Sequence, residues 1–203
     1  MPLDTYTNLK ASIADWLARD DLTSIIPDFI QMNEAKLSRR LRTRAQETTA
    51  TITTDANGQA SMPAYFQAVK QLVAQTSPRR DLEYLSPQAL EEQYGYRESG
   101  CPKFYTLIGA TLQVVPVYTG NLSLIYYAGI PALSGSLATN WLLTSHPGIY
   151  LYGSLLEAAK YSRDEEAIPT LSAILEEEIL SLESSDKASR WERGSARTKR
   201  RLP

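Results

Sequence analysis

The sequence predicts an α+β protein: an antiparallel helical bundle built from N- and C-terminal helices, an inserted antiparallel β-sandwich-like domain and an extended C-terminal tail. Three observations predict this class. Apolar residues recur at helical spacing near both ends of the chain. Short β-branched segments separated by turn sequences lie between them. The last residues are polar and basic. Runs of helices and runs of strands usually segregate into separate layers or domains, which favours an insertion.

The chain begins with the apolar spacing of an amphipathic helix. Five apolar residues are expected to share one face and to pack against a core. These residues are Tyr6, Leu9, Ile13, Trp16 and Leu17. The pattern predicts a helix over residues 6–19, which Asp20-Asp21 ends.

A second helix is expected immediately after this break. Thr23 or Ser24 can cap its first turn, and Pro27 lies near the position where proline is favoured. Two consecutive helices of this kind are typical of an antiparallel hairpin. We therefore assign residues 1–46 to the first part of a helical domain.

Residues 47–139 have the pattern of an inserted β-rich domain. Asn57-Gly58 is a strong turn sequence, and Ser86-Pro87 predicts a cap and a first turn for one short helix near residues 87–94. Several short strands with close turns are typical of an antiparallel sheet or sandwich. The strands are expected at residues 47–54, 67–75, 103–108, 111–117 and 122–127.

Helical spacing returns after Trp141. Two apolar stripes follow, separated by a break at Arg163-Asp164, so residues 140–186 are expected to complete the discontinuous helical domain. Apolar residues become sparse beyond Ser184. Residues 187–203 are therefore predicted to form an extended basic tail that is disordered when alone.

Charge is unevenly distributed along the chain. The formal net charge is -2, but residues 190–203 hold six basic residues and one acidic residue, so they carry +5 and the rest of the chain carries -7. A basic tail on an acidic body indicates that the tail binds something acidic. No apolar run approaches the roughly 20 residues that cross a bilayer, so we expect no membrane partner.

A second basic cluster lies at the end of the second predicted helix. It consists of Arg39, Arg40, Arg42 and Arg44. One interpretation is complementarity to the helix dipole together with solvation. The other is a patch that faces a neighbouring subunit or DNA.

The residues needed for catalysis or metal binding are scarce. One histidine, His146, and one cysteine, Cys101, cannot supply the usual zinc ligands. A hydrolase would have to pair His146 with Ser145 or Ser154, yet no nucleophile-elbow pattern surrounds any serine. No glycine loop of the phosphate-binding kind is present either. We therefore expect no catalytic residues, no metal and no cofactor, and a protein that is not an enzyme.

Three stretches carry the motifs of a known family. They are Ile26-Pro27-Asp28-Phe29-Ile30 with Glu34-Ala35-Lys36-Leu37; Tyr126-Tyr127-Ala128-Gly129-Ile130-Pro131-Ala132-Leu133; and Asn140-Trp141-Leu142-Leu143 with Pro147 and Tyr150-Leu151-Tyr152-Gly153-Ser154-Leu155-Leu156-Glu157-Ala158-Ala159. In these stretches the chain resembles the head-to-tail adaptor proteins of tailed bacteriophages, also called tail tubular protein A-like or head-completion proteins. The resemblance extends over nearly the whole chain, and the third stretch is the most specific.

This resemblance implies a structural virion protein that is assembled in the host bacterial cytoplasm. It implies a ring of twelve copies between the portal and the next tail protein, with DNA passing through the channel without sequence specificity. It also implies a helical domain near the portal, a β domain toward the tail, and a C-terminal tail in grooves between portal subunits. The portal-binding residues would then be Arg190, Trp191, Arg193, Arg197, Lys199, Arg200 and Arg201.

A nucleic-acid-binding module is the alternative function. Its basic tail would contact phosphates, and its affinity would fall steeply with salt. The acidic body and the lack of a recognisable reading helix weigh against this alternative.

Overall fold

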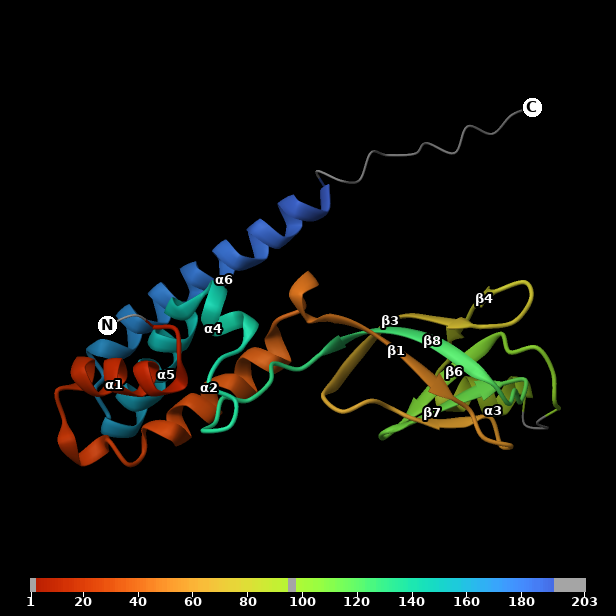
Figure 1. Cartoon of the computed structure of the whole chain (residues 1–203), viewed down its shortest axis with the longest axis horizontal. Helices are drawn as coiled ribbons and strands as arrows, with labels where there is room; N and C mark the ends of the chain where they lie inside the picture. The colour runs from red at the N-terminus through yellow and green to blue at the C-terminus, as the bar shows by residue number, and fades with distance from the viewer. Residues whose placement is uncertain (1–2, 95–97, 192–203) are drawn as a thin grey trace. The chain divides into compact units, whose positions relative to one another are not determined.

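The structure is a computed structural model that describes residues 3–94 and 98–191. It divides the chain into two compact units (Figure 1). A helical unit contains the chain up to Ala45 and from Ile130 onward, and a β unit contains Gln46–Gly129. The combination of helices and sheets confirms the predicted α+β class.

The helical unit has five α-helices in its described residues. They are α1 (Tyr6–Leu17), α2 (Ile26–Arg40), α4 (Trp141–Ser145), α5 (Pro147–Ser162) and α6 (Ala167–Trp191), with a short 3₁₀ turn at Asp20–Leu22. A second 3₁₀ turn, Arg44–Gln46, continues into the first residue of the β unit. Arg163 adopts a left-handed conformation with φ 57° and ends α5 where the sequence predicted a break. The start of α2 differs from the prediction, because neither Thr23 nor Ser24 is its N-cap. Ile25 takes that position, and the main-chain bond from Ile25 N to Leu22 O closes the preceding turn instead.

Two other boundaries differ from the predictions. Residues 130–139, expected in the β domain, belong to the helical unit, where Ile130 and Leu133 are part of the buried core. The helix α6 continues to Trp191, so residues 187–191, expected in the extended tail, are helical. Residues 187–191 include lysine, alanine and arginine, which are good helix formers. The earlier turns of α6 are anchored by the buried Ile179 and Leu182, so the helix continues although apolar residues become sparse.

The β unit holds two four-stranded sheets, with strand orders β1-β8-β3-β4 and β2-β7-β6-β5. One core takes buried side chains from both sheets, including Leu72, Leu112 and Leu124. Its elements are β1 (Glu47–Thr53), β2 (Gln59–Ser61), β3 (Phe66–Ala74), β4 (Arg80–Asp81), β5 (Glu83–Tyr84), α3 (Pro87–Tyr94), β6 (Phe104–Ile108), β7 (Thr111–Val115) and β8 (Asn121–Ala128).

One pairing corrects the prediction that the β domain is purely antiparallel. β5 pairs in parallel with β6, while the other ladders between named strands are antiparallel. Parallel neighbours need a crossover connection, and α3 lies in the connection between these two strands. The predicted cap of α3 is confirmed, because Ser86 Oγ accepts a hydrogen bond from Ala89 N at 3.2 Å.

A close approach of α2 to α5 depends on Gly153. The Asn33 side chain is buried against this glycine, and its Nδ2 donates to the main-chain oxygens of Ile149 and Tyr150 at 3.3 and 3.5 Å. A Cβ at position 153 would overlap the Asn33 side chain. Glycine is therefore required here for the packing of two helices that are far apart in sequence.

A buried polar network joins α2, α5 and the segment that precedes α4. Glu34 Oε1 accepts hydrogen bonds from Tyr150 Oη and Leu133 N, both at 2.9 Å. Asn140 Nδ2 donates to Tyr150 Oη at 2.7 Å and to Pro131 O at 2.8 Å, and its Oδ1 accepts from Leu143 N at 2.9 Å to cap α4. All three of the resemblance-bearing stretches therefore meet in this network.

Burial affects the ionisation of the network. Burial raises the pKa of Glu34 above its ordinary value of 4.5, although the bonds from Leu133 N and Tyr150 Oη oppose the rise. Burial and the nearby Glu34 carboxyl raise the pKa of Tyr150, so the phenol stays a neutral donor. The nearby Glu157 behaves differently: its own burial would raise its pKa, but hydrogen bonds from Lys36 and Lys160 outweigh that effect and lower it.

Replacing Gly153 with alanine is expected to destabilise the protein. The added methyl group must displace the Asn33 side chain, and overpacking of this kind costs about 1–3 kcal/mol. Gly148→Ala in the same helix is the matched control, since its Cβ would lie 3.3 Å from the Glu178 carboxyl carbon, at the end of a flexible side chain. Denaturant unfolding should show a lower midpoint for G153A alone. Equal stability of the two variants would contradict the packing argument.

The pKa of Glu34 predicts a pH dependence of stability. A carboxyl whose pKa is higher in the folded than in the unfolded state stabilises the fold only while it is protonated, so its contribution falls as pH rises above about 4.5. Glu34→Gln keeps an oxygen acceptor and removes the ionisation. The free energy of unfolding of E34Q relative to the wild type should therefore increase between about pH 4 and pH 7.

The matched control for this pH series is Glu177→Gln, because Glu177 is exposed on α6. Because Glu177 is exposed, E177Q measures the effect of a change from glutamate to glutamine outside the core. A flat difference for E34Q, equal to that of E177Q, would show that burial does not perturb Glu34.

Candidate interaction surfaces

The predicted portal-binding segment begins at the end of α6. Arg190 and Trp191 are the last two residues of this 25-residue helix. The other predicted residues lie outside the part of the chain that the structure describes: Arg193, Arg197, Lys199, Arg200 and Arg201. At 1.5 Å per residue α6 is about 38 Å long, so the basic segment starts far from the first turn of the helix.

The second half of α6 is held by the segment that follows α2. Ile179 and Leu182 are buried in the helical core. Asp186 Oδ1 accepts a hydrogen bond from Arg44 N at 2.8 Å. These contacts fix the helix up to about one turn before its last described residue.

The four arginines of the predicted basic patch are exposed but differ in their contacts. Arg40 donates two hydrogen bonds to the Glu176 carboxylate, at 2.5 and 2.6 Å. This bidentate bond raises the pKa of Arg40 and lowers that of Glu176. Arg42 donates to Ser38 O at 3.0 Å and to Leu41 O at 2.6 Å, so it satisfies main-chain oxygens at the end of α2. Both contacts favour the structural interpretation of these two residues.

Acidic residues of α6 lie beside this patch of arginines. A shallow depression of about 260 Å³ is lined by residues of both signs, so it has no single strong charge. The lining residues are Arg40, Arg42, Thr43, Glu183, Asp186 and Lys187. Arg39 is different, because it makes no ion pair with any residue in the described ranges and lies on the outer side of α2.

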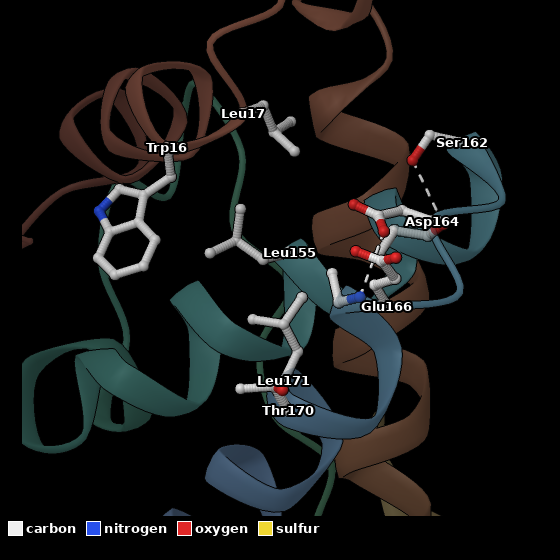
Figure 2. Close-up of a pocket in the computed structure, with 10 residues that line it drawn as sticks. Trp16, Leu17, Leu155, Ser162, Asp164, Glu166, Thr170 and Leu171 are labelled. Carbon is white, nitrogen blue, oxygen red and sulfur yellow. Dashed lines mark hydrogen bonds between the residues drawn. The ribbon is translucent and has the colours of Figure 1, made fainter.

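A groove between α1, α5 and α6 was not predicted from the sequence. It has a volume of about 510 Å³. Figure 2 shows Trp16, Leu17, Leu155 and Leu171 around one space, with Asp164 and Glu166 beside it. Two acidic residues and no basic residue line it. The sequence placed Trp16 on the buried stripe of the first helix, whereas its side chain is 60% exposed and contacts Tyr152 edge-on.

Trp16 lies in the last turn of α1 and its side chain is exposed. The helix finishes at Leu17, and Ala18 adopts a left-handed conformation with φ 49°. Ile13 and Leu9, about one and two turns earlier, are fully buried. The apolar spacing of this helix therefore identifies a face correctly but does not tell where neighbouring helices stop covering it.

Among the residues considered for catalysis, Ser154 and His146 are not hydrogen-bonded to each other in the described structure. His146 is the N-cap residue of α5, and Ser154 lies on the same helix with a fully buried side chain. Ser154 Oγ has no hydrogen-bond partner in the described structure, so no base contacts it there. Cys101 is exposed in the β unit. Within residues 3–94 and 98–191 no cluster of His, Cys, Asp and Glu could hold a metal ion.

Among the described helices, none combines the length and the apolar character that a membrane span requires.

Comparison with known proteins identifies the family. The family model for the SU10 adaptor protein matches residues 4–200, which include both the helical unit and the β unit. No curated protein sequence matches the chain. The family match confirms the resemblance that the three sequence stretches indicated. Because it covers nearly the entire chain, the protein belongs to the SU10 adaptor protein family, a family of bacteriophage head-to-tail adaptors.

Proposed function

We propose that this adaptor forms a ring of twelve copies in the virion neck, between the portal and the next tail protein, and that DNA passes through the ring. The family match carries this proposal, since it spans both units of the chain. Adaptors of this kind join two assemblies by binding. No chemical step is proposed, and the protein acts as a structural component without a metal or cofactor.

The two units would have different roles in the adaptor. In the proposal the helices form an antiparallel bundle on the portal side, and the two sheets form a β-sandwich-like domain on the tail side. The basic C-terminal segment would insert into grooves between portal subunits. The extent of α6 supports this part, because a helix packed through Leu182 presents the start of the segment at a defined place.

Charge and one aromatic side chain would govern docking. The basic residues after Ser189 would steer the chain toward an acidic portal surface, and Trp191 would anchor it in a pocket. A segment that orders on binding spends conformational entropy but can cover a large surface. The acidic remainder of the chain, at -7, would repel DNA and let it slide through the ring.

A nucleic-acid-binding module remains the second candidate function, and the +5 charge of residues 190–203 favours it. The bonds that Arg40 and Arg42 make within the chain weigh against a second phosphate-binding surface at the end of α2. Phosphate contacts would give an affinity for DNA that decreases steeply with salt.

Removal of the basic segment is expected to abolish binding to the cognate portal. Truncation after Ser189 deletes it together with the last two residues of α6. A full-length variant with Arg193, Arg197, Lys199, Arg200 and Arg201 changed to glutamine keeps the helix intact. Both should lose at least about 100-fold in portal affinity, since several charge-assisted contacts disappear, each worth about 1.5–3 kcal/mol. Thermal unfolding of both should match that of the wild type.

The control is a variant with Arg79 and Arg80 changed to glutamine, which removes exposed charge from the β unit. It should bind the portal as the wild type does. Unchanged portal binding by the truncated protein would contradict the proposed role of the segment. A DNA shift assay at two salt concentrations distinguishes the nucleic-acid-binding module from the adaptor. The nucleic-acid-binding module requires a DNA shift at low salt that is lost at high salt. The truncation should also abolish this shift.

A further inference from the structure

We propose that the groove between α1, α5 and α6 receives the outer face of α2 from a neighbouring copy of the chain. The groove and this face are defined by described residues of one unit. The inference deepens the proposed function, because it names the surfaces by which copies contact one another, and it rests on that function for the closure of the contacts into a ring.

The outer face of α2 has an apolar centre, a positive end at Arg39 and one acidic residue, Asp28, a turn before Met32. Met32, Ala35 and Arg39 are all exposed and lie at i, i+3 and i+7, which places them on one side of the helix. Met32 is 43% exposed, which is a large fraction for an apolar side chain on an otherwise packed helix. Arg39 lies about 10 Å further along the axis and has no ion pair within the described residues.

The groove complements this face, because it combines apolar walls with negative charge. Trp16, Leu155 and Leu171 supply apolar walls, and the acidic residues Asp164 and Glu166 stand at its edge (Figure 2). Asp164 Oδ1 already accepts a hydrogen bond from Ala167 N at 3.2 Å, at the start of α6. Glu166 has no such bond to a described residue and is the acid available for an incoming cation.

These two surfaces lie on opposite sides of α5. Gly153 and Glu157 contact α2, through Asn33 and Lys36. Leu155 and Ala159 line the groove instead. Positions two apart in an α-helix point about 200° apart, so the α2 side and the groove side of α5 face in nearly opposite directions. The outer face of α2 points away from α5, because its Asn33 and Leu37 side is buried.

Surfaces on opposite sides of one unit can join copies head to tail. Such a contact is heterologous, and it generates a closed ring when the rotation from copy to copy closes. An aromatic residue and apolar side chains at the centre, with charges at the edge, is the arrangement typical of a protein interface. The contact therefore explains why Trp16 and Met32 are both exposed on the helical unit.

Directional cross-linking of two variants tests the contact. Both carry Cys101→Ser, which removes the only native cysteine. One carries Met32→Cys and the other Thr170→Cys, both at exposed positions, so the fold should be unaffected. When the two are mixed at high concentration with a short bis-maleimide, mixed dimers should exceed either homodimer several-fold. A statistical mixture of dimers, or no dimer, would overturn the proposal.

Charge reversal tests the electrostatic part of the same contact. Arg39→Glu in the first variant should lower the yield of mixed dimer by roughly two- to five-fold, the range for one exposed ion pair. Glu166→Arg in the second variant should restore it. Arg79→Glu in the β unit is the control and should leave the yield unchanged.

Truncation after Trp191 in both variants tests whether α2 or a competing segment of the neighbouring copy occupies the groove. The basic C-terminal segment of a neighbour could also be attracted to Asp164 and Glu166, so loss of the mixed dimer on truncation would overturn the assignment to α2. Persistence of the mixed dimer would support it. Portal binding by the cysteine variants that keep the complete C-terminal segment reads out the adaptor role separately, so a failure of the groove contact does not depend on a failure of the proposed function.

Discussion

The helical unit depends on one buried carboxyl group. Glu34 is only 4% exposed, and burying a charged group without partners would be costly. Tyr150 Oη and Leu133 N both donate to it, and Asn140 holds the tyrosine from the other side. A side chain of α2 thereby fixes α5 and the chain that returns from the β unit, so the discontinuous halves of the helical unit are joined by specific bonds as well as by apolar packing.

Much of the fold could be predicted because its local patterns and tertiary packing agree. Five strands were expected close to their observed positions, and Ser86 caps α3 as predicted. The parallel pairing of β5 with β6 could not be predicted, since both paired segments are two residues long and carry no periodicity. Residues 130–139 were misplaced for a related reason: they contain Pro131 and Gly135 like a loop of the β domain, but Leu133 N is fixed by Glu34, which lies 99 residues earlier.

The interaction surfaces were less predictable than the fold. Four neighbouring arginines look alike in sequence, yet Arg40 is paired to Glu176, Arg42 binds main-chain oxygens, and Arg39 faces outward. The groove combines Trp16 with Leu171, residues from opposite ends of the sequence, and no local pattern connects them. Three residues of the stretches that carried the resemblance, Glu34, Tyr150 and Gly153, make contacts that hold the helices of this chain together.

The stability of Tyr150→Phe tests most directly whether the buried network holds the helical unit. The substitution removes only the hydroxyl group that Glu34 and Asn140 share. Tyr152→Phe is the matched control, since the hydroxyl of Tyr152 has no hydrogen bond to the described residues. The account predicts that Y150F lowers the free energy of unfolding by about 1–3 kcal/mol, the cost of leaving buried polar groups without a partner, and that Y152F changes it little. Equal stability of Y150F and the wild type would contradict the account.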